Sequence, residues 1–146
     1  MDQELAEYFF AEAARTFDFL VKDYSFAPPD LEVNNKIDFA TVTFMGKNLG
    51  VECILDEREA DITCKIARVI DGKKTTHYAV DENGVRVREG LFHLLQRRGV
   101  RERLFTSTGD LKLHDEIKTT LSDFAQMLKE HGGDILADSP GALADT

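Results

Sequence analysis

Four histidines are the first candidates for acid–base or metal chemistry in this chain: His77, His93, His114 and His131. None of them lies at the spacing of a zinc-binding pair such as HExxH. His77 has the chemistry of a general base, because Arg68 on a neighbouring strand would favour its neutral form. The sequence contains no nucleophile motif to accompany it, so a structural hydrogen bond is the favoured interpretation.

Metal and cofactor binding have little support in the sequence. Asp110 and His114 are one helical turn apart and could share a metal ion, but acidic residues in a first helical turn already interact favourably with the helix dipole. The chain has no glycine-rich phosphate loop and no cysteine–histidine cluster. We therefore predict no catalytic residue, no metal site and no cofactor.

The segment from Arg86 to Arg103 is strongly basic. It holds six arginines and two glutamates, although the whole chain has a net charge of −9. Arg86, His93, Arg97 and Arg101 are expected on the solvent side, where they could hold an anionic ligand. Local contact with phosphate or nucleic acid is a further alternative. The favoured interpretation is a solvated face whose arginines pair with nearby acids.

A second charged cluster is predicted at the tip of a hairpin. It consists of Asp56, Glu57, Arg58, Glu59 and Asp61. The spacing is not that of a calcium-binding loop, which has a central glycine. A solvated turn is the default interpretation, and binding of a basic protein partner is the functional alternative.

A central sheet, predicted between Ile37 and Val80, would position these side chains. A hairpin centred on residues 57–60 gives one wholly apolar face, and a slip of one residue would turn that face outward. The predicted cross-strand pairs are Leu55–Ile62, Ile54–Thr63, Cys53–Cys64, Glu52–Lys65 and Val51–Ile66, with Asp56 opposite Asp61. Apolar and opposite-charge pairs of this kind stabilise an antiparallel ladder.

The two other hairpins of this sheet are predicted from their turn residues. A two-residue turn at Gly46-Lys47 would place Phe44 opposite Leu49. A fourth strand, THYAV at residues 76–80, is expected after the turn that contains Gly72. Its phase stays open, because either His77 or Tyr78 could point inward.

Helices are predicted both before and after the sheet along the chain. Apolar residues at helical spacing indicate helices over residues 3–23, 89–98 and 113–131. Residues 24–35 are expected to form a connector, because Pro28-Pro29 excludes a continuous helix. Tyr8 and Phe19 lie on a second line of the first helix, which could pack internally or on a partner.

The length of 146 residues suits one domain, predicted over residues 1–136 and followed by a frayed tail over 137–146. No apolar run approaches the roughly 20 residues of a membrane span, and the acidic N-terminus is not a secretory signal. Two cysteines, Cys53 and Cys64, are predicted to be buried free thiols in the cytoplasm. The negative net charge disfavours nucleic-acid binding.

The order of the elements resembles a group of known proteins. The residues that carry the likeness are Phe17, Phe19, Leu20, Tyr24, Phe26, Asp56 and Arg58. In layout the chain is similar to small uncharacterised bacterial α+β proteins, some of which resemble immunity proteins of toxin systems. The resemblance implies a protein partner rather than a substrate, and it supplies no active site.

Together these patterns predict an α+β fold. An antiparallel meander of four to five strands is expected, with N-terminal and C-terminal helices packed chiefly on one face. The first functional expectation is a non-enzymatic interaction protein with an immunity-like or adaptor role, whose acidic surface meets a basic protein partner. The alternative is a ligand-binding domain or enzyme that uses His77 and the Arg86–Arg103 segment. A homodimer is left open.

Overall fold

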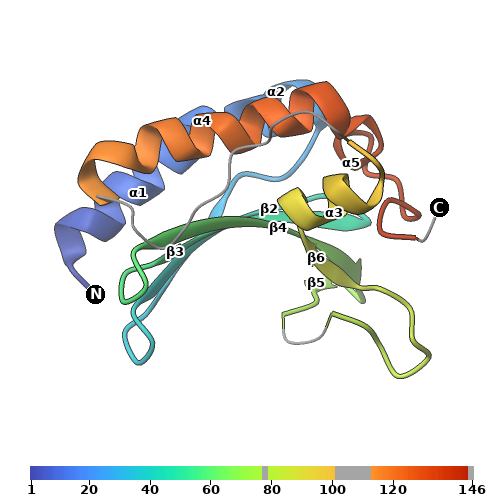
Figure 1. Cartoon of the computed structure of the whole chain (residues 1–146), viewed down its shortest axis with the longest axis horizontal. Helices are drawn as coiled ribbons and strands as arrows, with labels where there is room; N and C mark the ends of the chain where they lie inside the picture. Colours follow the sequence, from blue (N-terminus) through green and yellow to red (C-terminus); the bar gives the residue numbers. More distant parts are fainter. Residues whose placement is uncertain (77–78, 101–112, 145–146) are drawn as a thin grey trace.

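The chain forms a curled antiparallel sheet with helices on one face (Figure 1). A computed structural model describes residues 1–76, 79–100 and 113–144. The elements are α1 (Gln3–Thr16), α2 (Asp18–Tyr24), β1 (Asp30–Asn34), β2 (Phe39–Met45), β3 (Leu49–Asp56), β4 (Asp61–Ile70), β5 (Lys73–Lys74), β6 (Arg88–Gly90), α3 (Leu91–Arg97), α4 (Leu113–His131) and α5 (Gly133–Leu136). The strand order is β1-β2-β3-β4-β5, and β6 pairs with β4. The predicted α+β class is confirmed.

The register of β3 and β4 is the one predicted. Every pair from Val51–Ile66 to Asp56–Asp61 is present, including Cys53 opposite Cys64. The alternate pairs Val51–Ile66, Cys53–Cys64 and Leu55–Ile62 are apolar on both strands and belong to the core beneath the helices. This burial fixes the register, because a slip of one residue would expose the apolar row.

The predicted register of β2 and β3 is wrong by two residues. Phe44 pairs with Val51 rather than with Leu49, because the loop that follows β2 is longer than a two-residue turn. A shift of two residues leaves each side chain on its predicted face. Phe44 and Val42 are therefore fully buried, as expected.

The predicted connector over residues 24–35 is partly wrong. Its second half forms β1, an edge strand that pairs antiparallel with β2. All five residues of β1 are exposed. Leu31 and Val33 alternate with polar residues as in a strand, but this pattern is short, and the two prolines that precede it favoured a connector.

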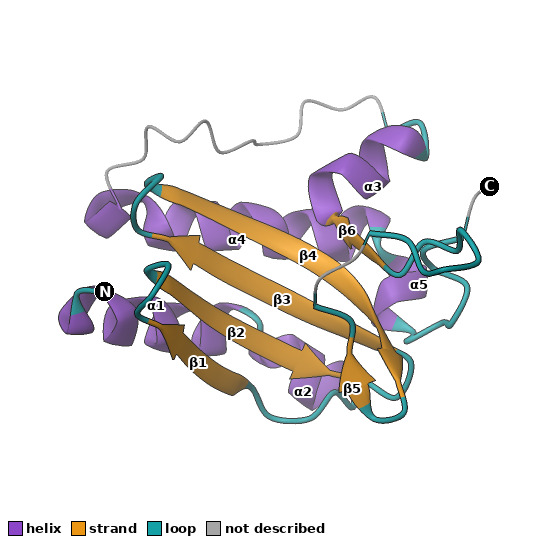
Figure 2. Cartoon of the chain, turned by 90° about the horizontal axis from the view of Figure 1, so that it is seen from below, coloured by secondary structure: helices purple, strands orange, loops and turns teal. Residues whose placement is uncertain are grey.

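The expected fourth strand at residues 76–80 is also wrong in extent. The chain instead forms the short strand β5 at Lys73–Lys74, and an isolated bridge joins Val80 to Arg86. His77 and Tyr78 lie outside the described residues, so their phase stays untested. In Figure 2, β5 crosses in front of the sheet, on the face that the helices do not cover.

Helices α1 and α4 cover the other face of the sheet (Figure 1). The predicted helix over residues 113–131 is confirmed, whereas the predicted helix over 3–23 is interrupted at Phe17 and forms α1 and α2. Asp2 caps α1 by accepting a hydrogen bond from the Leu5 backbone N–H at 2.9 Å. Phe9 and Leu121, one on each helix, are fully buried between helices and sheet. No helix among the described residues is long and apolar enough to span a membrane.

The predicted frayed tail is wrong for residues 137–144. Ala142 and Leu143 are buried, with exposed fractions of 1% each. Arg97 donates a hydrogen bond to the Leu143 carbonyl at 3.0 Å, and Arg98 binds both the Ala142 carbonyl and the Asp134 carboxylate. Two arginines of the basic segment therefore hold the C-terminal segment in place.

The side chain of Asp138 attaches this segment to the β2–β3 loop. Its carboxylate accepts hydrogen bonds from the backbone N–H groups of Lys47 at 2.6 Å, Asn48 at 3.1 Å and Leu49 at 2.8 Å. A Cβ atom at Gly46 would lie 2.6 Å from Asp138 Oδ1, so any larger residue there would force the Asp138 carboxylate to shift. Successive backbone N–H groups of this kind form a nest for an anion. The carboxylate explains why the loop is longer than predicted.

Cys53 and Cys64 should be unreactive in the folded protein. Both are buried free thiols, and the hydrogen bond that the Cys53 thiol makes to Cys64, together with burial, raises the pKa of Cys53 well above its usual range. Because the thiolate is the reactive form, a chromogenic thiol reagent at pH 8 should modify neither cysteine quickly in the native state. In denaturant without reductant, two thiols per chain should react. Fast native modification, or fewer than two thiols after unfolding, would contradict the buried free pair.

Candidate functional site

The hairpin tip between β3 and β4 contacts the N-terminus and the turn before β2. Arg58 Nε lies 2.8 Å from the Asp38 carboxylate, and Arg58 Nη2 donates to the Lys36 carbonyl at 2.9 Å. The N-terminal ammonium group of Met1 also donates to Asp38, at 2.9 Å. These two hydrogen bonds, from the ammonium group first and from Arg58 second, lower the pKa of Asp38. Arg58 therefore stabilises the fold through these two contacts rather than serving mainly to bind a partner.

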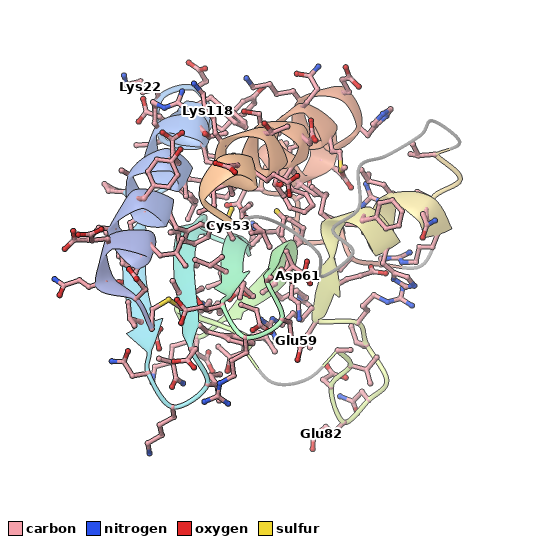
Figure 3. The ribbon with its side chains drawn as sticks, turned by 60° about the vertical axis from the view of Figure 1, so that its left-hand side comes forward. Lys22, Cys53, Glu59, Asp61, Glu82 and Lys118 are labelled. Atoms are coloured by element: carbon pink, nitrogen blue, oxygen red, sulfur yellow. The ribbon has the colours of Figure 1, made fainter. Side chains whose placement is uncertain are left out.

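The acidic residues of the tip are also partly engaged. Glu57 accepts the backbone N–H of Asp2 at 3.1 Å, and Asp56 accepts that of Glu59 at 3.1 Å. Asp61 accepts the N–H of the residue that follows it, and burial raises its pKa. Glu59 is exposed on the tip, and Figure 3 shows it beside Asp61. The residues of the predicted binding cluster therefore mainly connect the hairpin tip to the N-terminus and to the turn before β2, and the acidic side chain of Glu59 remains exposed.

Two segments of the chain, the second of which is this hairpin tip, account for the net negative charge. Residues 1–38 contain nine acidic and three basic residues, and residues 56–61 add four acids and one arginine. The remainder of the chain has 14 acids and 14 bases, so it is neutral overall. We call the surface of residues 1–38 and 56–61 the acidic edge. It carries the entire net charge of −9.

Strand β1 lies in the acidic edge and is the free edge of the sheet (Figure 2). Leu31 is 49% exposed and Val33 is 39% exposed, which is unusual for apolar strand residues. A groove of about 400 Å³ separates β1 from α1. Its lining residues are Met1, Gln3, Ala6, Glu7, Phe10, Val33 and Asn35. Apolar side chains and unpaired strand backbone thus occur together on one acidic surface.

The basic segment forms two ion clusters around buried carboxylates. Glu89, with a side chain that is 5% exposed, accepts from His93 at 2.5 Å and from Arg97 at 3.0 Å. Arg86 Nε lies 3.8 Å from the same carboxylate. Arginines of this segment therefore pair with a nearby acid, as the sequence indicated. Arg97 is not on the solvent side, however, because its side chain is only 17% exposed.

The second cluster lies on the face of the sheet opposite the helices. The Glu52 carboxylate is 2% exposed and contacts Lys74 Nζ at 2.7 Å and Arg88 Nε at 3.0 Å. Lys74 also donates to the Thr43 hydroxyl at 2.8 Å, and Arg88 donates to the Thr76 carbonyl at 2.7 Å. Glu52 therefore joins the middle of the sheet to the segment that crosses it.

A cleft of about 480 Å³ opens beside these two clusters. It is lined by Lys65, Ala79, Val80, Arg86, Arg88, Glu89, Gly90 and His93. We call this the cationic cleft. Burial, followed by the proximity of Arg88, lowers the pKa of Lys65. The side chain of Lys65 makes no hydrogen bond or ion pair with any residue that the structure describes, although it lies across the ladder from Glu52.

The predicted anion-binding residues separate in the structure. Arg86 and His93 line the cationic cleft, Arg97 supports Glu89 behind it, and Arg101 lies outside the described residues. Sequence reasoning did not include Lys65 and Arg88. The paired strands β4 and β6 bring these two side chains to the cleft, and no local pattern in the sequence indicates that β6 pairs with β4.

The described residues contain no group of three or more His, Cys, Asp or Glu side chains that could hold a metal ion. Asp110 and the side chain of His114, the predicted metal alternative, lie outside the described part of the chain.

Comparison of the chain with family models, with curated proteins and with solved structures finds no match. The acidic edge and the cationic cleft are therefore the features that bear on function.

Proposed function

We propose that the protein is an interaction module whose acidic edge binds a basic segment of a protein partner. The observation that carries the proposal is the separation of charge: residues 1–38 and 56–61 hold the entire net charge of −9. A surface potential of one sign speeds association with a partner of the opposite sign and excludes partners of the same sign. The layout resemblance to immunity-like proteins agrees with a protein partner.

Strand β1 supports a specific mode of binding, in which an extended segment adds a strand to the sheet. An edge strand presents unpaired backbone N–H and C=O groups, which can pair with such a segment. Leu31 and Val33 lie on the helix side of β1, across from Val42 and Ala40, whereas Glu32 lies on the other side. A segment that alternates apolar and basic residues would match both sides.

A second copy of this chain is a poorer occupant of the same edge. Antiparallel pairing of two β1 strands centred on Glu32 would place the two Glu32 side chains directly opposite each other. Like charges in that position are destabilising. Glu7 on α1, which lines the groove, adds further negative charge to each copy. The charge pattern thus favours a basic partner over self-association.

A labelled peptide of alternating lysine and valine should bind the protein, and the same peptide with glutamate in place of lysine should not. Fluorescence anisotropy at low ionic strength measures the dissociation constant. The double variant Asp30→Lys/Glu32→Lys should weaken binding about tenfold or more, because two favourable charge contacts become repulsive. Binding to the native protein should also weaken as salt is added.

The matched control is Glu82→Lys/Glu130→Lys, which changes the net charge equally at acids outside the acidic edge. Its affinity should remain close to that of the native protein. Equal weakening by both double variants would mean that net charge alone drives binding and would reject the β1 site. A concentration-dependent dimer in size-exclusion chromatography, abolished by the Asp30→Lys/Glu32→Lys variant, would assign the edge to a second copy instead.

A further inference from the structure

We propose that the cationic cleft is a binding site for a phosphate group carried by a small molecule. The site is separate from the acidic edge, because its lining comes from β4, β6, α3 and the segment before β6. It therefore adds a second binding function to a protein whose net charge would otherwise repel anions.

The charge balance of the cleft favours an anion. Three cationic side chains line the cleft, Lys65, Arg86 and Arg88, against one carboxylate, that of Glu89. The lining therefore has two more positive than negative charges. An excess of this size suits a doubly charged group better than a single carboxylate.

Lys65 is the side chain that most needs such a ligand. It is a partly buried cation whose pKa is lowered by burial and by Arg88, with only a smaller opposing effect from Glu52, and the described residues give it no hydrogen bond or ion pair. Burying a charge without a partner is unfavourable. An anion in the cleft would offset both the loss of water around Lys65 and the repulsion from Arg88.

The remaining side chains define how a phosphate would be held. The guanidinium groups of Arg86 and Arg88 are planar sets of N–H donors, which match phosphate oxygens; Arg88 already donates from Nε to Glu52 and from Nη1 to the Thr76 carbonyl, so these contacts orient it toward the cleft. Glu89 holds His93 at the rim of the same cleft, and protonated His93 could donate to the ligand as well. Ala79 and Val80 provide an apolar wall. Because a volume of about 480 Å³ exceeds the size of inorganic phosphate, a phosphate monoester with a small organic group fits the space.

The test measures the binding of inorganic phosphate and of a simple aryl phosphate by titration calorimetry and by thermal melting. Sodium chloride at matched ionic strength is the reference. Phosphate should raise the melting temperature beyond the effect of chloride, because a ligand of the native state stabilises it. The Lys65→Met variant should bind phosphate about tenfold more weakly, as expected for the loss of one charge-assisted contact.

Lys118→Met is the matched control, because it removes the same charge from an exposed site on α4, away from the cleft (Figure 3). Its phosphate affinity should equal that of the native protein. The Lys65→Met variant should fold, since Lys65 has no hydrogen bond or ion pair among the described residues, and its melting in chloride verifies this. The absence of any phosphate effect beyond that of chloride, or equal binding by both variants, would overturn the proposal.

A short single-stranded oligonucleotide distinguishes a small-molecule phosphate from a nucleic-acid backbone. The acidic edge should repel a polyanion, so the oligonucleotide should bind no more tightly than the aryl phosphate. Much tighter binding of the oligonucleotide, lost in the Lys65→Met variant, would assign the cleft to nucleic acid and reject the small-molecule proposal.

Discussion

Replacing Asp138 by alanine should lower the free energy of unfolding by about 3 kcal/mol, because a hydrogen bond to a charged group contributes roughly 1.5–3 kcal/mol and several are lost together. Its carboxylate accepts three backbone N–H groups of the β2–β3 loop, at distances from 2.6 to 3.1 Å. Without the carboxylate these donors lose their partner, and the C-terminal segment loses its attachment to the sheet. Urea denaturation followed by circular dichroism measures the change.

A double-mutant cycle with Gly46 makes this prediction specific. A Cβ at residue 46 would lie 2.6 Å from Asp138 Oδ1, so Gly46→Ala should be destabilising in the native background. In the Asp138→Ala background the clashing oxygen is absent, and the cost of Gly46→Ala should largely disappear. Equal costs of Gly46→Ala in the two backgrounds would show that the loop and the carboxylate are not in contact.

The contact between Asp138 and the β2–β3 loop illustrates which parts of the fold could be predicted from the sequence. The β3–β4 hairpin has a short polar tip between two alternating apolar strands, so local pattern and burial determine its register. The β2–β3 loop looked equally simple, but its shape depends on Asp138, which lies about 90 residues away in the chain. Turn chemistry read from four residues carries no information about such a distant partner.

The candidate sites show the same limit. The basic segment was correctly expected to pair with nearby acids, since Glu89 lies within one helical turn of His93. Assigning Arg97 to the solvent side was wrong, because its partners include a backbone carbonyl of the C-terminal segment. A segment of small residues such as residues 137–144 has no periodicity that would predict its burial. The residues that line the cationic cleft were not predicted to lie together, because the pairing of β6 with β4 brings them to one place and these strands are distant in the sequence.

Replacing Glu52 by alanine should also destabilise the protein strongly, by about 3 kcal/mol or more. The carboxylate is 2% exposed and is the shared partner of Lys74 and Arg88, whose side chains are 18% and 17% exposed. Removing it would leave two partly buried cations next to each other. Breaking a buried pair costs more than the pair contributes, because the remaining charge keeps its desolvation penalty. Urea denaturation of the variant measures the cost.

Removing Lys74, one of the two remaining cations, as well should recover part of this loss. In the double variant Glu52→Leu/Lys74→Met, the Glu52–Lys74 ion pair is replaced by apolar side chains of similar size, which is often neutral or stabilising in a protein interior, and only Arg88 is left without the carboxylate. The double variant should therefore be more stable than Glu52→Leu alone, which would be a coupling between neighbouring residues. Glu82→Ala, at an exposed loop residue, serves as the control and should change stability by less than about 0.5 kcal/mol. A cost below about 1 kcal/mol for Glu52→Ala would mean that Glu52 does not join β5 and β6 to the sheet. The cationic cleft would then lack the carboxylate that positions Arg88.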